Sequence, residues 1–182
     1  MGNQEWETPP DFWAVLNEEF DFQLDAAASS DNTKCYHYYS KDDNALSPDR
    51  PWVAYGARST DGLVEVGWQL RVYCNPGFRD MMPWVKKCYA EAQKHPDALV
   101  GLVGPLSAAK WFAFCVKNAD EIRILTPRIQ FVAPPGVKQS SNSKDNVLIV
   151  FRQKTMPCPA IITVWPWREK LTALQKQPKG FK

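Results

Sequence analysis

A short apolar run that stops at an Asn-Pro-Gly turn, Val72-Tyr73-Cys74-Asn75-Pro76-Gly77-Phe78, constrains the fold of this chain most strongly. Residues 70–74 predict a short buried strand. Pro76 and Gly77 must end it, because proline lacks the N–H donor that a strand ladder needs and Pro-Gly favours a turn. Asn75 is therefore expected at the carboxyl end of a strand, which is where open α/β sheets bind their ligands.

The chemistry of this turn suits an amino group that carries two hydrogens. The Asn75 side-chain carbonyl and the Pro76 backbone carbonyl are two acceptors side by side, which fit an exocyclic amine such as that of adenine. Phe78 follows on the loop, where its ring can stack on a base. An ordinary turn followed by a core phenylalanine explains the same four residues, because such turn residues are common. Both interpretations stay open at this point.

Strand patterns alternate with helix patterns from residue 12 to residue 118, which predicts an α/β fold. We expect a Rossmann-like, mostly parallel sheet with helices on both faces. The first expected helix starts within residues 8–11, with Thr8 or Pro9 near its cap, and runs to residue 20; the other two span residues 79–95 and 108–118. The expected strands span residues 22–26, 70–74, 98–103, 122–125 (leading into 126–131), 147–151 and 161–165. Residues 51–70 predict a hairpin around Thr60-Asp61-Gly62, and residues 29–50 a loop or short helix. On the second helix we expect Lys86, Lys87, Glu91 and Lys94 to face water.

Composition narrows the class of protein. With 182 residues and no linker, the chain is expected to form one domain, residues 1–182. A net charge of +2 excludes a strong global basic field, so nucleic-acid binding would need local patches. Five cysteines without CxxC spacing predict reduced thiols in a cytoplasmic protein and neither a disulfide framework nor a zinc site. We expect no metal site, and no apolar run approaches the length that a bilayer requires.

Two further segments carry candidate chemistry. Asp25 is followed by the small residues Ala26, Ala27 and Ala28, which would let the backbone approach a nucleoside cofactor, although a plain tight turn has the same pattern. Residues 132–146 form a polar loop expected to be mobile; phosphates favour its Lys138, Ser140, Asn142 and Lys144, but a disordered surface loop fits equally well. The basic tail, residues 168–182, either adds phosphate affinity or frays.

The chain resembles the phage-type DNA adenine-N-6 methyltransferase (Dam-like) family over residues 4–151. The Asn75–Phe78 turn is similar to the (Asp/Asn/Ser)-Pro-Pro-(Tyr/Phe) motif of amino-directed methyltransferases. The other matching pieces are Glu5-Trp6-Glu7-Thr8-Pro9, Phe12, Leu16, Glu19-Phe20-Asp21-Phe22, Leu24-Asp25-Ala26-Ala27, Lys34-Cys35, Trp84, Trp111 and Arg128-Ile129-Gln130-Phe131.

This resemblance implies methylation of adenine in double-stranded DNA with S-adenosyl-L-methionine as methyl donor. It implies that Asn75, Pro76 and Phe78 are catalytic. The implied cofactor-binding residues are Thr8, Pro9, Asp25, Ala26, Ala27, Asp43 and Asn75. Arg128 joins the four loop residues as an expected DNA contact, and a phage-encoded enzyme would work in the cytoplasm of its bacterial host. The oligomeric state is not predicted.

The chain departs from the family pattern at two places. The cofactor segment has no Gly-x-Gly, and Gly77 stands where the family has proline. Two alternatives therefore stay open: a catalytically silent DNA-binding or interaction module on the same fold, and a methyltransferase acting on RNA or on protein glutamine. Because the acceptors belong to residues 75 and 76, we expect Gly77→Pro to be tolerated.

Overall fold

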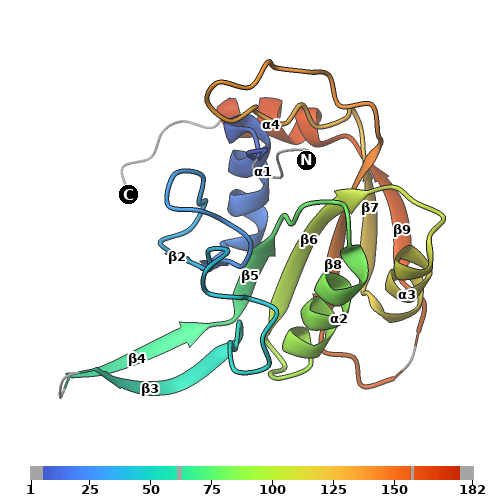
Figure 1. Cartoon of the computed structure of the whole chain (residues 1–182). Helices are drawn as coiled ribbons and strands as arrows, with labels where there is room; N and C mark the ends of the chain where they lie inside the picture. The colour runs from blue at the N-terminus through green and yellow to red at the C-terminus, as the bar shows by residue number, and fades with distance from the viewer. Residues whose placement is uncertain (1–5, 61–62, 157, 177–182) are drawn as a thin grey trace.

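A seven-stranded sheet forms the centre of the molecule (Figure 1), with the strand order β2-β1-β5-β6-β8-β7-β9. A computed structural model of the chain describes residues 6–60, 63–156 and 158–176, with the backbone alone for residues 55–68. The strands of this sheet are β1 (Leu24–Asp25), β2 (His37–Tyr38), β5 (Arg71–Cys74), β6 (Leu99–Pro105), β7 (Glu121–Leu125), β8 (Asn146–Arg152) and β9 (Ile161–Trp165). Only β8 runs antiparallel to its neighbours, so the expected mostly parallel α/β sheet is confirmed.

Helices cover both faces of the sheet, as expected. On one face α1 (Pro10–Phe20) and α4 (Trp167–Gln175) bury Phe12, Leu16 and Trp167 in a core that includes Tyr73 of β5. On the other face α2 (Met81–Ala92) and α3 (Lys110–Asn118) pack with Val72 and the rest of the second core. The helix at residues 167–175 was not predicted, because one buried anchor residue next to a basic tail gives no helical pattern. That anchor is Trp167, whose indole N–H donates to the Pro127 carbonyl at 2.6 Å.

The hairpin expected within residues 51–70 is confirmed as β3 (Ala54–Thr60) paired antiparallel with β4 (Leu63–Gln69). Asp61 and Gly62 of its expected turn lie outside the described residues. The short strand β2 was missed, because its two side chains are exposed and carry no apolar pattern. Main-chain bonds hold it beside β1, including Tyr39 N–H to the Asp25 carbonyl at 2.9 Å.

Glu91 and Lys87 of α2 do not face water, contrary to the expectation from helical spacing. The Glu91 side chain is 1% exposed and accepts the backbone N–H groups of Trp52 and Val53, each at 3.0 Å. Lys87 and Lys94 pair with the same carboxylate at 2.9 and 2.7 Å. The segment before β3 packs over this part of α2, and a pattern confined to one helix cannot reveal such a cover.

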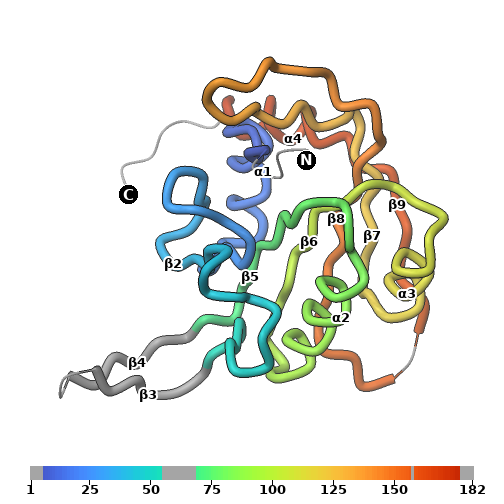
Figure 2. The backbone as a smooth tube through the Cα atoms, viewed as in Figure 1, coloured from blue at the N-terminus to red at the C-terminus, as the bar shows by residue number. Residues whose placement is uncertain are grey.

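The chain between β7 and β8 crosses the carboxyl ends of the central strands (Figure 2). Regular strand structure stops at Leu125, which agrees with the strand expected over residues 122–125. The segment that follows contains a cis Thr126–Pro127 bond, and its Val132 pairs with Glu7 of the N-terminal segment through an isolated bridge.

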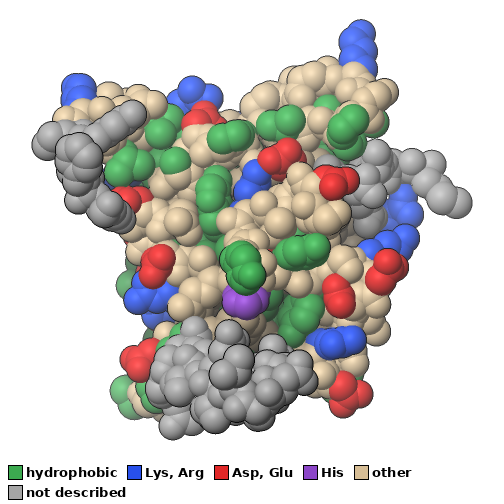
Figure 3. All heavy atoms as spheres, turned by 90° about the vertical axis from the view of Figure 1, so that its left-hand side faces the viewer, with side chains coloured by type: hydrophobic (Ala, Val, Ile, Leu, Met, Phe, Trp, Pro, Cys, Tyr) green, Lys and Arg blue, Asp and Glu red, His purple; other side chains and the backbone are tan. Residues whose placement is uncertain are grey.

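The surface shows no concentration of one charge on the face seen in Figure 3, where acidic and basic side chains are interspersed. This agrees with the small net charge of +2. Within the described ranges, every helix is too short or too polar to cross a membrane.

Candidate functional site

Asn75 and Asp25 lie at the same edge of the sheet. β5 runs parallel to β1, with Tyr73 opposite Asp25 in register, so Asn75 leaves β5 just beyond the end of β1. β6 flanks β5 on its other side, with Gly101 opposite Tyr73. The carboxyl ends of neighbouring parallel strands thus bring an amide and an acid together, as the turn after residue 74 predicts.

The buried hydroxyl of Thr8, which is itself bonded to the hydroxyl of Tyr73, holds the carboxamide of Asn75. Its Nδ2 donates a hydrogen bond to Thr8 Oγ1 at 3.0 Å, and Thr8 Oγ1 lies 2.5 Å from the hydroxyl oxygen of Tyr73. Thr8 is 2% exposed and Tyr73 is 1% exposed. Because the amide nitrogen is engaged by Thr8, its carbonyl oxygen is the atom left to face a ligand.

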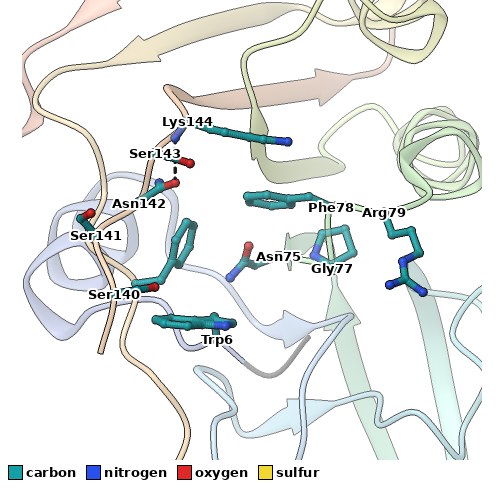
Figure 4. A pocket seen from close by; sticks show the side chains of 12 residues that line it. Trp6, Asn75, Gly77, Phe78, Arg79, Ser140, Ser141, Asn142, Ser143 and Lys144 are labelled. Atoms are coloured by element: carbon teal, nitrogen blue, oxygen red, sulfur yellow. Dashed lines mark hydrogen bonds between the residues drawn. The ribbon is translucent and has the colours of Figure 1, made fainter. Parts of the chain in front are cut away.

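A large cavity of about 410 Å³ opens beside this amide (Figure 4). It is lined by Trp6, Asn75, Pro76, Gly77, Phe78, Arg79, Phe131 and Ser140–Lys144. Phe78 meets Phe131 edge to face, with ring centroids 5.8 Å apart. An aromatic wall beside two carbonyl acceptors suits a planar heterocycle that carries an amino group.

A second, small cavity of about 20 Å³ also borders Asn75. Its lining residues are Trp6, Glu7, Thr8, Asp25, Ala27, Asn32, Lys34, Tyr73 and Asn75. The Asp25 carboxylate accepts the backbone N–H groups of Lys34 at 3.1 Å and Ala27 at 3.3 Å. Burial raises the pKa of Asp25 from 3.8 to about 6, while these two hydrogen bonds oppose the rise. The small cavity therefore presents an acid whose charge depends on pH close to neutrality.

Trp6 and Asn75 line both cavities, so the two spaces share a wall. The N-terminal segment is held across this wall by Glu7, which pairs with Val132 through two backbone bonds of 2.9 Å. The Glu7 carboxylate also forms an ion pair with Lys34 at the edge of the small cavity. A group bound at Asp25 and a base in the large cavity would thus meet at Asn75.

Three residues expected to bind a cofactor do not line either cavity. Pro9 is buried as the residue before α1, and Ala26 is fully buried in the core. The Asp43 carboxylate accepts the Ser40 N–H at 2.8 Å and the Ser40 hydroxyl at 2.6 Å, which lowers its pKa and closes a local turn. The assignment of these three residues to a cofactor stays a prediction. Among the residues that the structure describes, no group of three or more His, Cys, Asp or Glu side chains is placed to hold a metal.

The loop over residues 132–146 is cross-tied by its own side chains. Gln139 bonds to the Phe131 carbonyl at 2.7 Å and to the Ala133 N–H at 2.9 Å, and Asn142 reaches the Ile129 carbonyl at 3.1 Å. These bonds hold it against residues 129–133 and bring part of it over the large cavity.

The five predicted DNA contacts divide into two groups. Ser140, Asn142 and Lys144 line the large cavity. Lys138 is exposed on the loop outside the lining. Arg128 also lies outside it and pairs with Asp145 at 2.6 Å.

Sequence reasoning did not assign several lining residues to the site, among them Trp6, Lys34, Arg79 and Phe131. Trp6 and Phe131 were named only among the residues that match the family. An isolated aromatic residue has no local sequence pattern that distinguishes a cavity wall from the core. Arg79 follows Phe78 directly, so its position beside the turn was a usable signal.

Comparison with known proteins identifies the family of the chain. The family model described as DNA N-6-adenine-methyltransferase (Dam) matches residues 2–176. The chain belongs to the Dam family. Membership of this family makes it an adenine-specific DNA methyltransferase. The resemblance noted from the Asn75 turn is thereby confirmed.

Two curated Dam relatives come from phages. The DNA N-6-adenine-methyltransferase of Haemophilus phage HP1 is 29% identical over 155 residues, covering 82% of this chain and 79% of the relative. The protein of the same name from Escherichia phage T1 is 30% identical over 165 residues, covering 81% of this chain but 62% of that protein.

Proposed function

We propose that the chain transfers a methyl group from S-adenosyl-L-methionine to the exocyclic amine of adenine in double-stranded DNA, acting as one methyltransferase domain. The observation that carries this proposal is Asn75, which lines two cavities at once: one walled by Phe78 and Phe131, the other by Asp25. Methyl transfer needs a donor and an acceptor that approach one another across a shared boundary, within roughly 3–3.5 Å before reaction.

The small cavity fits one end of the methyl donor. S-adenosyl-L-methionine, when bound, supplies an electrophilic methyl group and carries an amino group that the Asp25 carboxylate can hold. A volume of about 20 Å³ has room for one amino group but not for a whole nucleoside. The remainder of the donor would therefore lie outside this small cavity.

The large cavity receives the target base. The adenine amine cannot be reached inside a duplex, so the nucleotide must be flipped out of the stack. A volume of about 410 Å³ lies within the usual range of small-molecule sites, roughly 300–1,000 Å³. Phe78 stacks on the base and Asn75 Oδ1 accepts one amine hydrogen, while the Pro76 carbonyl accepts the other.

These two acceptors prepare the amine for reaction. Bonds that hold both hydrogens draw the nitrogen lone pair out of conjugation with the ring and direct it at the methyl carbon. With the donor bound, a nitrogen–carbon bond would form as the carbon–sulfur bond breaks with its electron pair going to sulfur, and the amine would then lose one proton to solvent. No covalent bond to the protein is involved.

The assay is mass spectrometry of nucleosides released from DNA after incubation with protein and S-adenosyl-L-methionine. N6-methyladenine is expected with the wild-type protein, and Asn75→Ala should lower its rate of formation by about 100-fold or more, as for loss of a preorganised polar partner. Full activity of Asn75→Ala would rule out this assignment. Methylated product in RNA or at protein glutamine, with none in DNA, would show that the proposed substrate class is wrong. Failure to bind the donor in calorimetry would favour a catalytically silent module.

A further inference from the structure

We propose that the buried hydroxyl of Tyr73 is a positioning group that, through Thr8, keeps the carboxamide oxygen of Asn75 facing the large cavity. This inference rests on the proposed function of Asn75. The Tyr73 ring is buried in the core on one face of the sheet, and Tyr73 also lines the small cavity beside Asn75.

The amide of Asn75 has two ends of similar shape and opposite hydrogen-bonding character. With Oδ1 toward the base, it accepts a hydrogen from the amine; rotated by half a turn, it would present an NH₂ group to another NH₂ group. The rotated form cannot assist the reaction, because both groups are donors. The bond from Nδ2 to Thr8 Oγ1 at 3.0 Å selects the productive orientation only while Thr8 acts as acceptor.

Thr8 has a single hydroxyl hydrogen, and its use depends on Tyr73. The two hydroxyl oxygens lie 2.5 Å apart and either can donate. In the proposed arrangement Thr8 donates to Tyr73, which directs its hydrogen away from Asn75 and leaves a Thr8 lone pair for the amide nitrogen. Without the phenol oxygen, the Thr8 hydroxyl is free to rotate and to donate to Asn75 instead, which stabilises the rotated amide. The three groups therefore form one hydrogen-bond relay, in which the hydroxyl of residue 73 decides which end of the Asn75 amide faces the large cavity.

The phenol is held firmly enough to perform this role. Trp13 of α1 contacts the Tyr73 ring edge to face at 5.1 Å between centroids, and Phe22 contacts it at 5.5 Å. Burial raises the pKa of Tyr73 well above its usual 10, while the Thr8 bond partly opposes the rise, so the phenol stays neutral. A neutral phenol between fixed aromatic rings can accept from Thr8 but does not act as a base.

The decisive comparison is Tyr73→Phe measured in two backgrounds. Loss of one hydrogen bond should lower kcat by about 2- to 10-fold, with little change in KM for S-adenosyl-L-methionine. In an Asn75→Asp background the same substitution should have almost no effect, because a carboxylate presents an acceptor oxygen in either orientation. An equal loss in both backgrounds would show a merely structural role and overturn the proposal.

Variants at Thr8 and a distant tyrosine provide the controls. Thr8→Val should reproduce the kcat loss, and Thr8→Ser, which restores the hydroxyl, should recover most of it. Tyr89→Phe makes the same chemical change on α2, away from both cavities, and should leave kcat unchanged. Wild-type kcat in Tyr73→Phe would also overturn the proposal.

A second readout needs no turnover. The side-chain NH₂ resonances of Asn75, assigned by their loss in Asn75→Ala, should move in Tyr73→Phe and stay in place in Tyr89→Phe. If no variant methylates DNA, the proposed function fails while this measurement still tests the relay. Unmoved resonances in Tyr73→Phe would overturn the relay even if the enzyme proves active.

Discussion

Single atoms decide what the site can do, because three of its side chains carry both donor and acceptor capacity. The Asn75 amide is oriented by a Thr8 hydroxyl that lies 67 residues earlier in the chain. Gly77 is not among the glycines with positive φ, so its backbone does not demand glycine. Proline at this position, as in the family pattern, is therefore expected to be accommodated.

Asp25→Asn should change stability in a pH-dependent manner. The pKa of Asp25 in the folded protein is about 6, above its ordinary 3.8, because burial disfavours the carboxylate. Its contribution to stability is fully present below pH 3.8 and is lost as the pH rises through 6. The stability of the variant with a neutral asparagine, relative to wild type, should thus rise by about 3 kcal/mol between pH 3.5 and pH 8.

Urea denaturation at pH 3.5, 6 and 8 measures this effect. The same variant should bind S-adenosyl-L-methionine more weakly at pH 8, because it lacks the charge that holds an amino group. A stability difference that is constant across the pH range would contradict the assignment of the raised pKa to Asp25.

Strand β6 shapes the site without contributing a reactive group. Its Gly101 lies opposite Tyr73, and the space beside it holds the Phe22 ring that packs on Tyr73. A Cβ atom built at Gly101 would lie 2.6 Å from Phe22 Cζ, closer than real contacts allow. A missing side chain on one strand thus sets the position of the phenol on the next.

Gly101→Ala should destabilise the protein by about 1–3 kcal/mol, because a rigid ring must move in a packed core. It should also lower kcat through displacement of Tyr73. Gly104→Ala on the same strand is the matched control, since its Cβ would meet the flexible end of Met81 at 3.1 Å. Thermal unfolding of both variants makes the comparison, and an equal cost at the two positions would refute this packing argument.

At the scale of the whole molecule, the net charge of +2 means that DNA affinity must come from local basic groups, and we expect the rim of the large cavity to supply some of them. Arg79 and Lys144 reach this rim from separate segments, the loop after β5 and the loop before β8 (Figure 4). Each phosphate contact releases counterions, so it contributes about 0.9 to the slope of log K against log salt.

Lys144→Ala should reduce that slope by about 1 and weaken binding to all DNA sequences alike. The control is Lys117→Ala, an exposed lysine in the last turn of α3, which runs away from the cavity edge. Fluorescence anisotropy with a DNA duplex at several salt concentrations measures both slopes. Equal slopes for Lys144→Ala and wild type would remove Lys144 from the DNA interface.

Local chemistry determined the parts of this protein that depend on neighbours in sequence. The end of β5 follows from Pro76 and Gly77, and the α/β class follows from the alternation of strand and helix patterns. The Asn75 turn could be assigned to a strand end, and Ser140, Asn142 and Lys144 could be named as a group.

Tertiary structure alone decided the remainder, because sheet order and long-range partners are not encoded in local periodicity. It inserted β8 antiparallel between β6 and β7, covered Glu91 with the segment before β3, and brought Trp6 and Thr8 against Asn75. The sequence by itself thus determined where an amide would stand at the end of a strand. Which atom of that amide faces the large cavity was decided only by contacts between segments far apart in the chain.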